Sequence, residues 1–248
     1  MTLRLRWRQV LAICKKNMRI YYSEPPVLIF GVLFPFVLFA AFALGRDIPP
    51  AGLAPGLLGI TLFFTGSSVG PFITPWETRT RTLEKLLTSP TSVTILVLGD
   101  VLAAVIFGAA IATFVITASV AGFGVQISSP LLLSANMVVS SCCYASMGSM
   151  FSALPTDKPA NVMMLSNVIR LPIIFVSGVF VPLENLPNWG RLLSFASPVT
   201  YTTDLMRYTL GGGSLISPSL ALLALVGFTT VFLAGSIYFH ARTIRSRI

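Results

Sequence analysis

Residues 77–90 read ETRTRTLEKLLTSP, a polar stretch between two hydrophobic runs that are each long enough to cross a membrane. As a helix, its second half places Leu83, Leu86 and Leu87 on one face. Pro90 limits how far that helix continues. Two interpretations are open: an ordinary solvated loop, or a short amphipathic helix that docks a soluble partner.

The composition indicates a membrane protein. Hydrophobic residues make up 54% of the 248 residues, charged residues only 10%, and the mean hydropathy is +0.84. Soluble domains carry about 25% charged residues. The net charge of +9 therefore indicates cations that hold loops on the cytoplasmic side rather than a nucleic-acid-binding surface. No CxxC or His-rich spacing occurs, so we expect no metal site and no cofactor bound by this chain.

The N-terminal 22 residues contain six cations spread along their length, unlike the uninterrupted apolar core of a signal peptide. On a helical wheel, the apolar side chains form a stripe about 100° wide, and most of the cations lie opposite it. The stripe consists of Leu3, Trp7, Val10, Leu11, Cys14, Met18 and Tyr21, and the opposite cations are Arg4, Arg8, Lys15 and Arg19. Residues 1–22 therefore predict an amphipathic helix in the membrane interface, with its basic face toward lipid headgroups or the cytosol.

Six hydrophobic runs predict an all-α polytopic membrane protein with six transmembrane helices in a single transmembrane domain, residues 1–248. The predicted spans are residues 27–44, 53–73, 95–121, 131–154, 161–181 and 220–239. Pro35 is a candidate kink in the first span. The second span is expected to close at Pro75 and Trp76, with the tryptophan as an interfacial anchor.

The distribution of cations predicts the orientation. Thirteen of the 17 Lys and Arg residues lie in the N-terminal segment, the loop after span two, the turn at Lys158 and the C-terminal tail. Three lie in the opposite loops, and Arg170 lies within span five. By the positive-inside rule, both termini and residues 77–90 are expected to be cytoplasmic, in a prokaryotic-type plasma membrane.

Residues 182–218 do not read as a simple loop. Pro187 and Pro198 divide them into two short helical pieces, about 188–196 and 199–209. Neither reaches the roughly 20 residues that a membrane span needs. We expect both pieces at the outer interface or dipping into it, either as caps of the bundle or as an external gate.

Charges and aromatic residues within the spans leave alternatives open. Arg170 either makes a structural salt bridge or snorkels, or it faces a cavity and holds an anionic or amphipathic substrate. Asp100, near the start of span three, has the same structural alternatives. The phenylalanines of the first two spans either line an apolar path or face lipid and core. They are Phe34, Phe36, Phe39, Phe42, Phe63 and Phe64.

The chain contains no phosphate-binding loop of the GxxxxGK[ST] type and no hydrolytic constellation, so we expect that it is not an enzyme. An ion-coupled secondary transporter is the alternative, but it favours several intramembrane acids and an internal repeat. An integral-membrane enzyme favours clustered His, Asp or Glu residues at one interface. The sequence offers neither pattern.

Two stretches carry a resemblance to a known family. The first has Thr82, Leu83, Glu84, Leu86, Leu87 and Pro90 after span two. The second is SGVFVPLENLPNW at 177–189, followed by SPVTY at 197–201 and DLMR at 204–207. In the order and spacing of these motifs and in its six-span layout, the chain resembles the permease subunit of type-2 ABC exporters. This family includes drug-resistance permeases and lipo-oligosaccharide or polysaccharide exporters. Asp100 departs from the family, which commonly has a cation or neutral residue there.

The resemblance implies a transporter that moves a hydrophobic or amphipathic substrate, such as a drug, lipid or glycolipid or polysaccharide, out of the cytoplasm. Residues 1–22 correspond to the connecting helix, 77–90 to a coupling helix in a cleft of the ATPase subunit, and 182–209 to re-entrant external helices. A second copy of the chain or a homologous permease completes the membrane part. Each permease has an ABC ATPase partner, which binds the ATP and Mg.

Three sets of site residues follow from these interpretations. The expected ATPase contacts, with the leucines as the contact face, are Arg79, Arg81, Thr82, Leu83, Glu84, Lys85, Leu86, Leu87 and Pro90. The candidate substrate path is Arg170, Phe34, Phe36, Phe63 and Phe64. The candidate external gate is Ser177, Gly178, Pro182, Glu184, Pro187, Trp189, Pro198 and Arg207.

Overall fold

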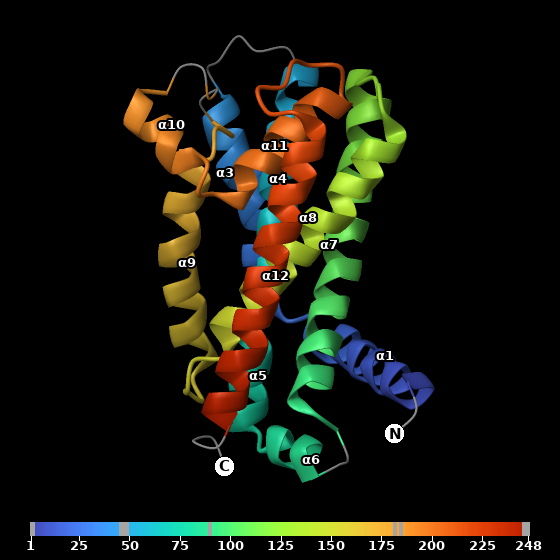
Figure 1. The fold of residues 1–248 in the computed structure, drawn as a ribbon, viewed down its shortest axis with the longest axis vertical. Coiled ribbons are helices and arrows are strands. Elements are labelled where there is room, and N and C mark those ends of the chain that lie inside the picture. The colour runs from blue at the N-terminus through green and yellow to red at the C-terminus, as the bar shows by residue number, and fades with distance from the viewer. Residues whose placement is uncertain (1–2, 45–49, 89–90, 181–182, 184–185, 245–248) are drawn as a thin grey trace.

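The computed structural model describes residues 3–44, 50–88, 91–180, 183 and 186–244, and every regular element in these ranges is a helix. The elements are α1 (Leu3–Ile20), α2 (Pro25–Leu28), the π-helical turn η1 (Ile29–Leu33), α3 (Phe34–Ala43), α4 (Pro50–Ser68), α5 (Gly70–Arg79), α6 (Thr82–Thr88), α7 (Val93–Phe123), α8 (Pro130–Ser152), α9 (Pro159–Val176), α10 (Asn188–Ser194), α11 (Pro198–Thr209) and α12 (Pro218–Thr243). They form an elongated bundle with α1 and α6 at one end and α10 and α11 at the other (Figure 1).

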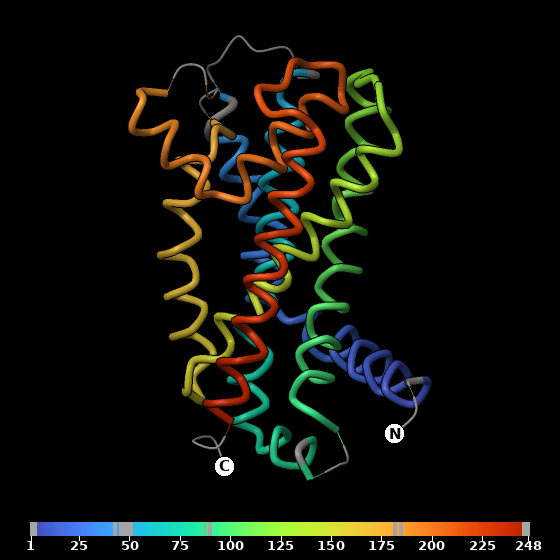
Figure 2. Tube along the Cα trace, viewed as in Figure 1, coloured from blue at the N-terminus to red at the C-terminus, as the bar shows by residue number. Residues whose placement is uncertain are grey.

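Five helical segments of the described residues are long and apolar enough to cross a membrane. They are Gly52–Arg79, Val93–Phe123, Pro130–Ser152, Pro159–Val176 and Pro218–Thr243. A sixth is obtained if α1 and the helix after it count as one bent span, although their axes differ by 91°. The trace shows α1 lying across the bundle (Figure 2). The prediction of an all-helical polytopic membrane protein is confirmed, and the count of six depends on how this bent pair is treated.

The segment predicted as the first span is one continuous helix of three parts, α2, η1 and α3. Its π-helical turn ends at Leu33, two residues before Pro35. Pro35 has no N–H to donate, so the regular bonding pattern has to change at this point. A π turn is one way in which a helix absorbs such a mismatch.

The second span differs from the prediction. It breaks at Val69, between α4 and α5, and then continues through Pro75 and Trp76 to Arg79. A proline removes only one backbone N–H donor from a helix, so the hydrogen bonds of the other turns can persist around Pro75. The Thr78 hydroxyl donates to the Thr74 carbonyl oxygen at 2.8 Å. The helix itself therefore continues past Pro75 and Trp76, the residues at which the span was expected to close.

Near this break, the second span crosses α8 with backbone against backbone. A Cβ atom added to Gly70 would lie 2.3 Å from the carbonyl carbon of Gly148. A Cβ atom added to Gly148 would lie 2.7 Å from the carbonyl oxygen of Ser67. Above this crossing, Phe63 and Tyr144 pack in the core with ring centroids 5.1 Å apart. Helix α8 also contacts α7 and α12, so it lies at the centre of the bundle.

Candidate functional site

Helix α6 is a short helix of 7 residues, about two turns, between the ends of α5 and α7. It starts three residues after the last residue of α5, and α7 follows it at Val93. The sharp change of direction uses Arg81, whose φ of 54° is in the left-handed region. This conformation is uncommon for residues other than glycine, and it costs about 1 kcal/mol or more. Thr80 and Arg81 thus form the turn that sets the direction of α6 relative to α5 in this structure.

The leucine face of α6 contacts this chain. Leu83 is 4% exposed, and Leu86 packs against a cluster formed by Val10, Ile13, Ile95 and Leu96. These side chains attach α6 to α1 and α7. Leu83 therefore does not present itself to an outside protein, in contrast to the expectation that the leucines form the contact face. The Leu87 side chain and Pro90 lie outside the described residues.

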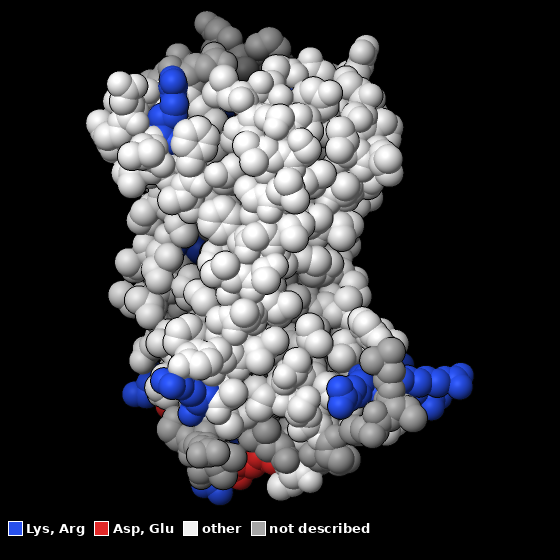
Figure 3. All heavy atoms as spheres, in the orientation of Figure 1, with Lys and Arg blue, Asp and Glu red and all other residues white. Residues whose placement is uncertain are grey.

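The surface formed by α6 and the residues just before it carries exposed cations. Arg79, Arg81 and Lys85 are exposed, and Thr82 and Glu84 are half-buried. The space-filling view shows Lys and Arg side chains gathered at this end, while the flank of the bundle carries almost none (Figure 3). A partner at this end meets a positive surface supported by a short, well-anchored helix.

Five polar side chains, which we call the α1 junction, fasten α1 to the bundle next to α6. They are Lys16, Asn17, Tyr21, Glu77 and Asp100. Glu77, 4% exposed at the end of α5, accepts hydrogen bonds from the Lys16 ammonium and, at 3.1 Å, from the Tyr21 hydroxyl. The Asn17 amide donates to the Asp100 carboxylate of α7 at 2.6 Å. One helix is thereby joined to both helices that flank α6.

Two features of the α1 junction favour a fixed hydrogen-bond pattern. Burial and the neighbouring Glu77 carboxylate raise the pKa of Tyr21, so the phenol keeps its proton and remains a donor. Ile13 contacts α7 at Gly99, where an added Cβ would lie 2.5 Å from the isoleucine side chain. These five residues were not predicted as a cluster from the sequence. The signals were Asn17 on the inner side of α1 and the isolated acid Asp100 in a span.

A cavity of about 20 Å³ lies between the α1 junction and α6, with Glu77, Leu83, Asp100 and His240 in its wall. This is room for about one water molecule. His240 Nδ1 is 2.8 Å from the carbonyl oxygen of Ser236, which can only accept, so Nδ1 carries the proton. Among the described residues, no three His, Cys, Asp or Glu side chains come together as a metal site.

A much larger groove of about 950 Å³ runs along the flank of the bundle between α9, α5 and the start of the first span. Its lining residues are Pro26, Phe30, Phe72, Trp76, Arg79, Asp157, Lys158, Pro159, Ala160, Asn161, Met163, Met164, Asn167, Val168 and Leu171. Most of the wall is aromatic, aliphatic or thioether surface. Such a groove is large enough for a drug-sized or lipid-like molecule.

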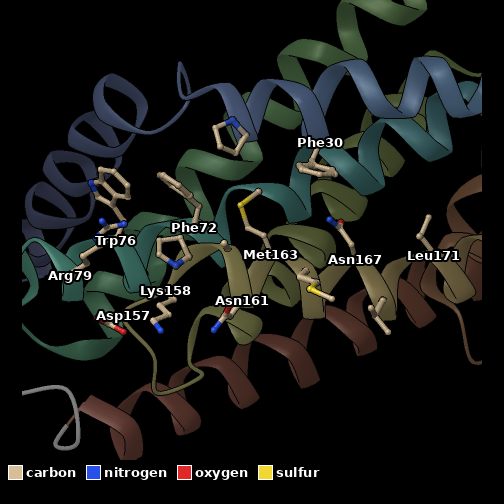
Figure 4. Close-up of a pocket in the computed structure, with 15 residues that line it drawn as sticks. Phe30, Phe72, Trp76, Arg79, Asp157, Lys158, Asn161, Met163, Asn167 and Leu171 are labelled. Carbon is tan, nitrogen blue, oxygen red and sulfur yellow. The ribbon is translucent and has the colours of Figure 1, made fainter.

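The charged groups of the groove are concentrated at one end. Arg79, Asp157 and Lys158 lie together there, while Phe30 and Leu171 lie toward the other end (Figure 4). Asn167 adds an amide whose oxygen is buried without a hydrogen-bond partner. The groove therefore matches an amphipathic molecule with its polar group at the α6 end. In the sequence, the missed signal was the stripe Asn161, Met164, Val168 and Leu171 along one side of α9.

The predicted path residues come together, but in the core. Phe63, Phe64 and Arg170 are fully buried, and Phe34 and Phe36 pack against the same cluster. The Arg170 guanidinium lies over the Phe64 ring at 5.7 Å and donates to the Ser67 hydroxyl at 3.3 Å and to the Ser166 hydroxyl at 2.7 Å. None of the five lines the groove, and in the described part of the chain Arg170 has no carboxylate partner.

Helices α10 and α11, which carry several of the candidate gate residues, lie at the opposite end from α6 (Figure 1). Arg207 of α11 donates to the carbonyl oxygen of Gly178 at 2.8 Å, which joins α11 to the turn after α9. Gly178 has a φ of 77°, a conformation that glycine adopts readily. Asp204, which was not singled out as a gate residue, accepts from the backbone N–H groups of the segment before α12.

The remaining gate residues are unevenly placed. Ser177 is buried, Pro187 precedes the first residue of α10, Pro198 begins α11, and Trp189 is 68% exposed. Pro182 and Glu184 lie outside the described residues. The short helices are Asn188–Ser194 and Pro198–Thr209, close to the predicted pieces 188–196 and 199–209.

Sequence comparisons relate this chain to known proteins. A sequence profile of the family described as ABC-2 type transporter matches residues 8–210. Over 128 residues, which is 51% of this chain, the sequence is 27% identical to the probable multidrug ABC transporter permease YbhR of Escherichia coli K12. The protein of the same description from Escherichia coli O157:H7 matches equally. The matched segment covers 34% of these relatives, so the match spans about a third of their length.

Proposed function

Since this chain belongs to the ABC-2 type transporter family, we propose that it is the membrane-spanning permease subunit of an ATP-driven exporter. The observation that carries the proposal is the placement of α6. This short helix has exposed cations, packs on α1 and α7, and is connected to α5 through the turn at Arg81. A separate ABC ATPase subunit binds ATP and Mg and contacts this end of the bundle. A second copy of the chain or a homologous permease completes the transporter.

In the proposed mechanism, movement of the ATPase subunits is transmitted to the membrane helices through α6. When the ATPase subunits close on ATP, the partner moves α6, and the rigid connection at Arg81 carries the movement into α5. The α1 junction makes α1 and α7 follow, so the inner ends of three helices move as one body. The ATPase sits on the cytoplasmic side, which agrees with the excess of cations at this end.

We assign substrate entry to the groove rather than to the buried Arg170 cluster. An apolar wall with one charged end suits an amphipathic drug, lipid or glycolipid, whose polar group meets Arg79 and Lys158. Helix α5 lines the groove and leads directly into α6, so movement of α6 changes the shape of the groove. The substrate then leaves at the end that carries α10 and α11.

Reversing charge on α6 tests the contact with the ATPase. In membranes with the cognate ATPase, an Arg81→Glu/Lys85→Glu variant is expected to lose roughly tenfold or more of substrate-stimulated ATP hydrolysis and export, because like charges replace complementary ones. The control is Arg191→Glu on α10, at the other end of the molecule. Full activity of the α6 variant would exclude this surface as the contact.

Shortening the groove wall tests the substrate site. Trp76→Ala and Phe30→Ala are each expected to weaken binding of an amphipathic substrate by roughly tenfold, since each removes about 1–2 kcal/mol of apolar contact. Binding is measured on the purified permease by displacement of a fluorescent amphiphile. Ile169→Ala, on another side of α9 and in the wall of a separate cavity, is the control and should bind normally. Equal losses in all three variants would contradict the assignment.

A further inference from the structure

The outer surface of α1 differs from the simple two-sided helix that its sequence predicts. The buried side consists of Val10, Ile13, Cys14 and Asn17, which face the bundle. Trp7 and Leu11 belong to the predicted apolar stripe, yet they are 59% and 55% exposed. The bundle thus covers only part of the apolar stripe and leaves a tryptophan and a leucine at the surface.

The exposed apolar residues border a row of cations. Arg4, Arg8, Lys15 and Arg19 occupy positions i, i+4, i+11 and i+15, which fall on one side of a helix, and all four are exposed. Helix α1 contains no acidic residue from Leu3 to Ile20. The cations therefore have no compensating negative charge on their own helix.

The position of α1 matches a membrane surface. It makes an angle of 91° with the helix that follows it, so it runs parallel to the membrane plane if that helix crosses the membrane. Its cations appear at the α6 end of the space-filling view (Figure 3). Cations beside Trp and Leu on a helix of this orientation are typical of helices that bind at the lipid interface.

We propose that this face of α1, made of Arg4, Trp7, Arg8, Leu11, Lys15 and Arg19, is a binding surface for anionic phospholipids. Trp7 and Leu11 contact the upper part of the acyl chains, and the cations contact the lipid phosphates. The 91° angle between α1 and the helix that follows it places this mixed face along the lipid interface, where acyl chains cover Trp7 and Leu11 and phosphates meet the cations, so lipid is the occupant that the surface favours.

The test uses the permease alone, so that it does not depend on an ATPase partner. A variant that retains only Trp7, obtained with Trp76→Phe and Trp189→Phe, reports on this face alone. Its fluorescence is titrated with brominated short-chain phosphatidylglycerol and, separately, with brominated phosphatidylcholine of the same chains. We expect quenching at much lower concentrations of the anionic lipid, with an affinity that falls as salt is added.

Charge variants in the same background test the cations. Arg4→Gln/Arg8→Gln/Lys15→Gln is expected to weaken binding of phosphatidylglycerol by roughly 100-fold, from about 1 kcal/mol per cation, and to leave phosphatidylcholine unaffected. Arg4→Lys/Arg8→Lys keeps the charge and should keep the preference. Equal affinity for the two lipids, no effect of salt, or unchanged binding by the glutamine variant would each overturn the proposal. The salt titration on the unchanged cations decides the matter even if the glutamine variant does not fold.

Discussion

Replacing Gly70 by alanine is expected to lower the free energy of unfolding by about 3 kcal/mol, the upper end of the range for overpacking. The added Cβ would lie 2.3 Å from the carbonyl carbon of Gly148 and 2.6 Å from its carbonyl oxygen. Because those atoms are backbone, no rotamer change can relieve the clash, and α5 and α8 must separate. The gain in helix propensity from Gly to Ala, about 1 kcal/mol, is smaller.

The measurement is the thermal unfolding of detergent-purified protein, followed by the amount of monodisperse protein that remains after heating. Gly227→Ala on α12 is the matched control, since nothing lies within 4 Å of its added Cβ. Gly148→Ala should behave like Gly70→Ala. A double variant should cost less than the two single costs together, because both alter the same contact. If Gly70→Ala unfolded like Gly227→Ala, the close crossing would be wrong.

The sequence alone could not predict this crossing. Hydropathy shows that a segment spans the membrane, and the small residues of α8 indicate close packing. The partner of a glycine, however, is set by tertiary geometry that no local pattern records. The same limit explains the second span: Pro75 signals a boundary, but contacts from α1 and α8 keep the helix intact to Arg79.

The second large effect is expected at Glu77. Glu77→Leu should lower the free energy of unfolding by about 3 kcal/mol, because it leaves the Lys16 ammonium and the Tyr21 hydroxyl without their acceptor. Lys16 is 22% exposed at its side chain and can reach water, so the loss stays at the low end for a broken buried pair. In a complex with the ATPase, the loosened α1 junction should also reduce transport per ATP hydrolysed. Unfolding temperature and transport stoichiometry are the two measurements.

A second substitution separates a specific pair from general damage. Adding Lys16→Met to Glu77→Leu removes the unpaired cation, and most of the lost stability should return, since an apolar pair often replaces a buried ion pair at little cost. Transport per ATP should not return, because the polar connection between α1 and α5 is still missing. Glu84→Gln on α6 is the control for the effect of losing a carboxylate on stability. No recovery of stability in the double variant would contradict the pairing of Lys16 with Glu77.

The sequence indicated some features of the site and not others, and the reasons are physical. Leu83 and Leu86 were recognised as one face because a helical period is local, but what covers that face depends on α1 and α7. Arg170 is a conspicuous charge in a span, and its partners proved to be serines, which no charge count reveals. The groove was missed because its wall is contributed by three separate segments, each of which alone reads as ordinary apolar sequence.

The break at Val69 has a consequence for how the two ends of the molecule are related. Both halves of the second span pack against α8; the outer half, α4, also packs against α11, and the inner half, α5, also packs against α9 and α6. A span divided in this way does not have to move as one rod, because the inner half can tilt about residue 69 while the outer half stays with its neighbours. Opening toward one side of the membrane and closing toward the other can then occur at different times, which is the condition that alternating access requires.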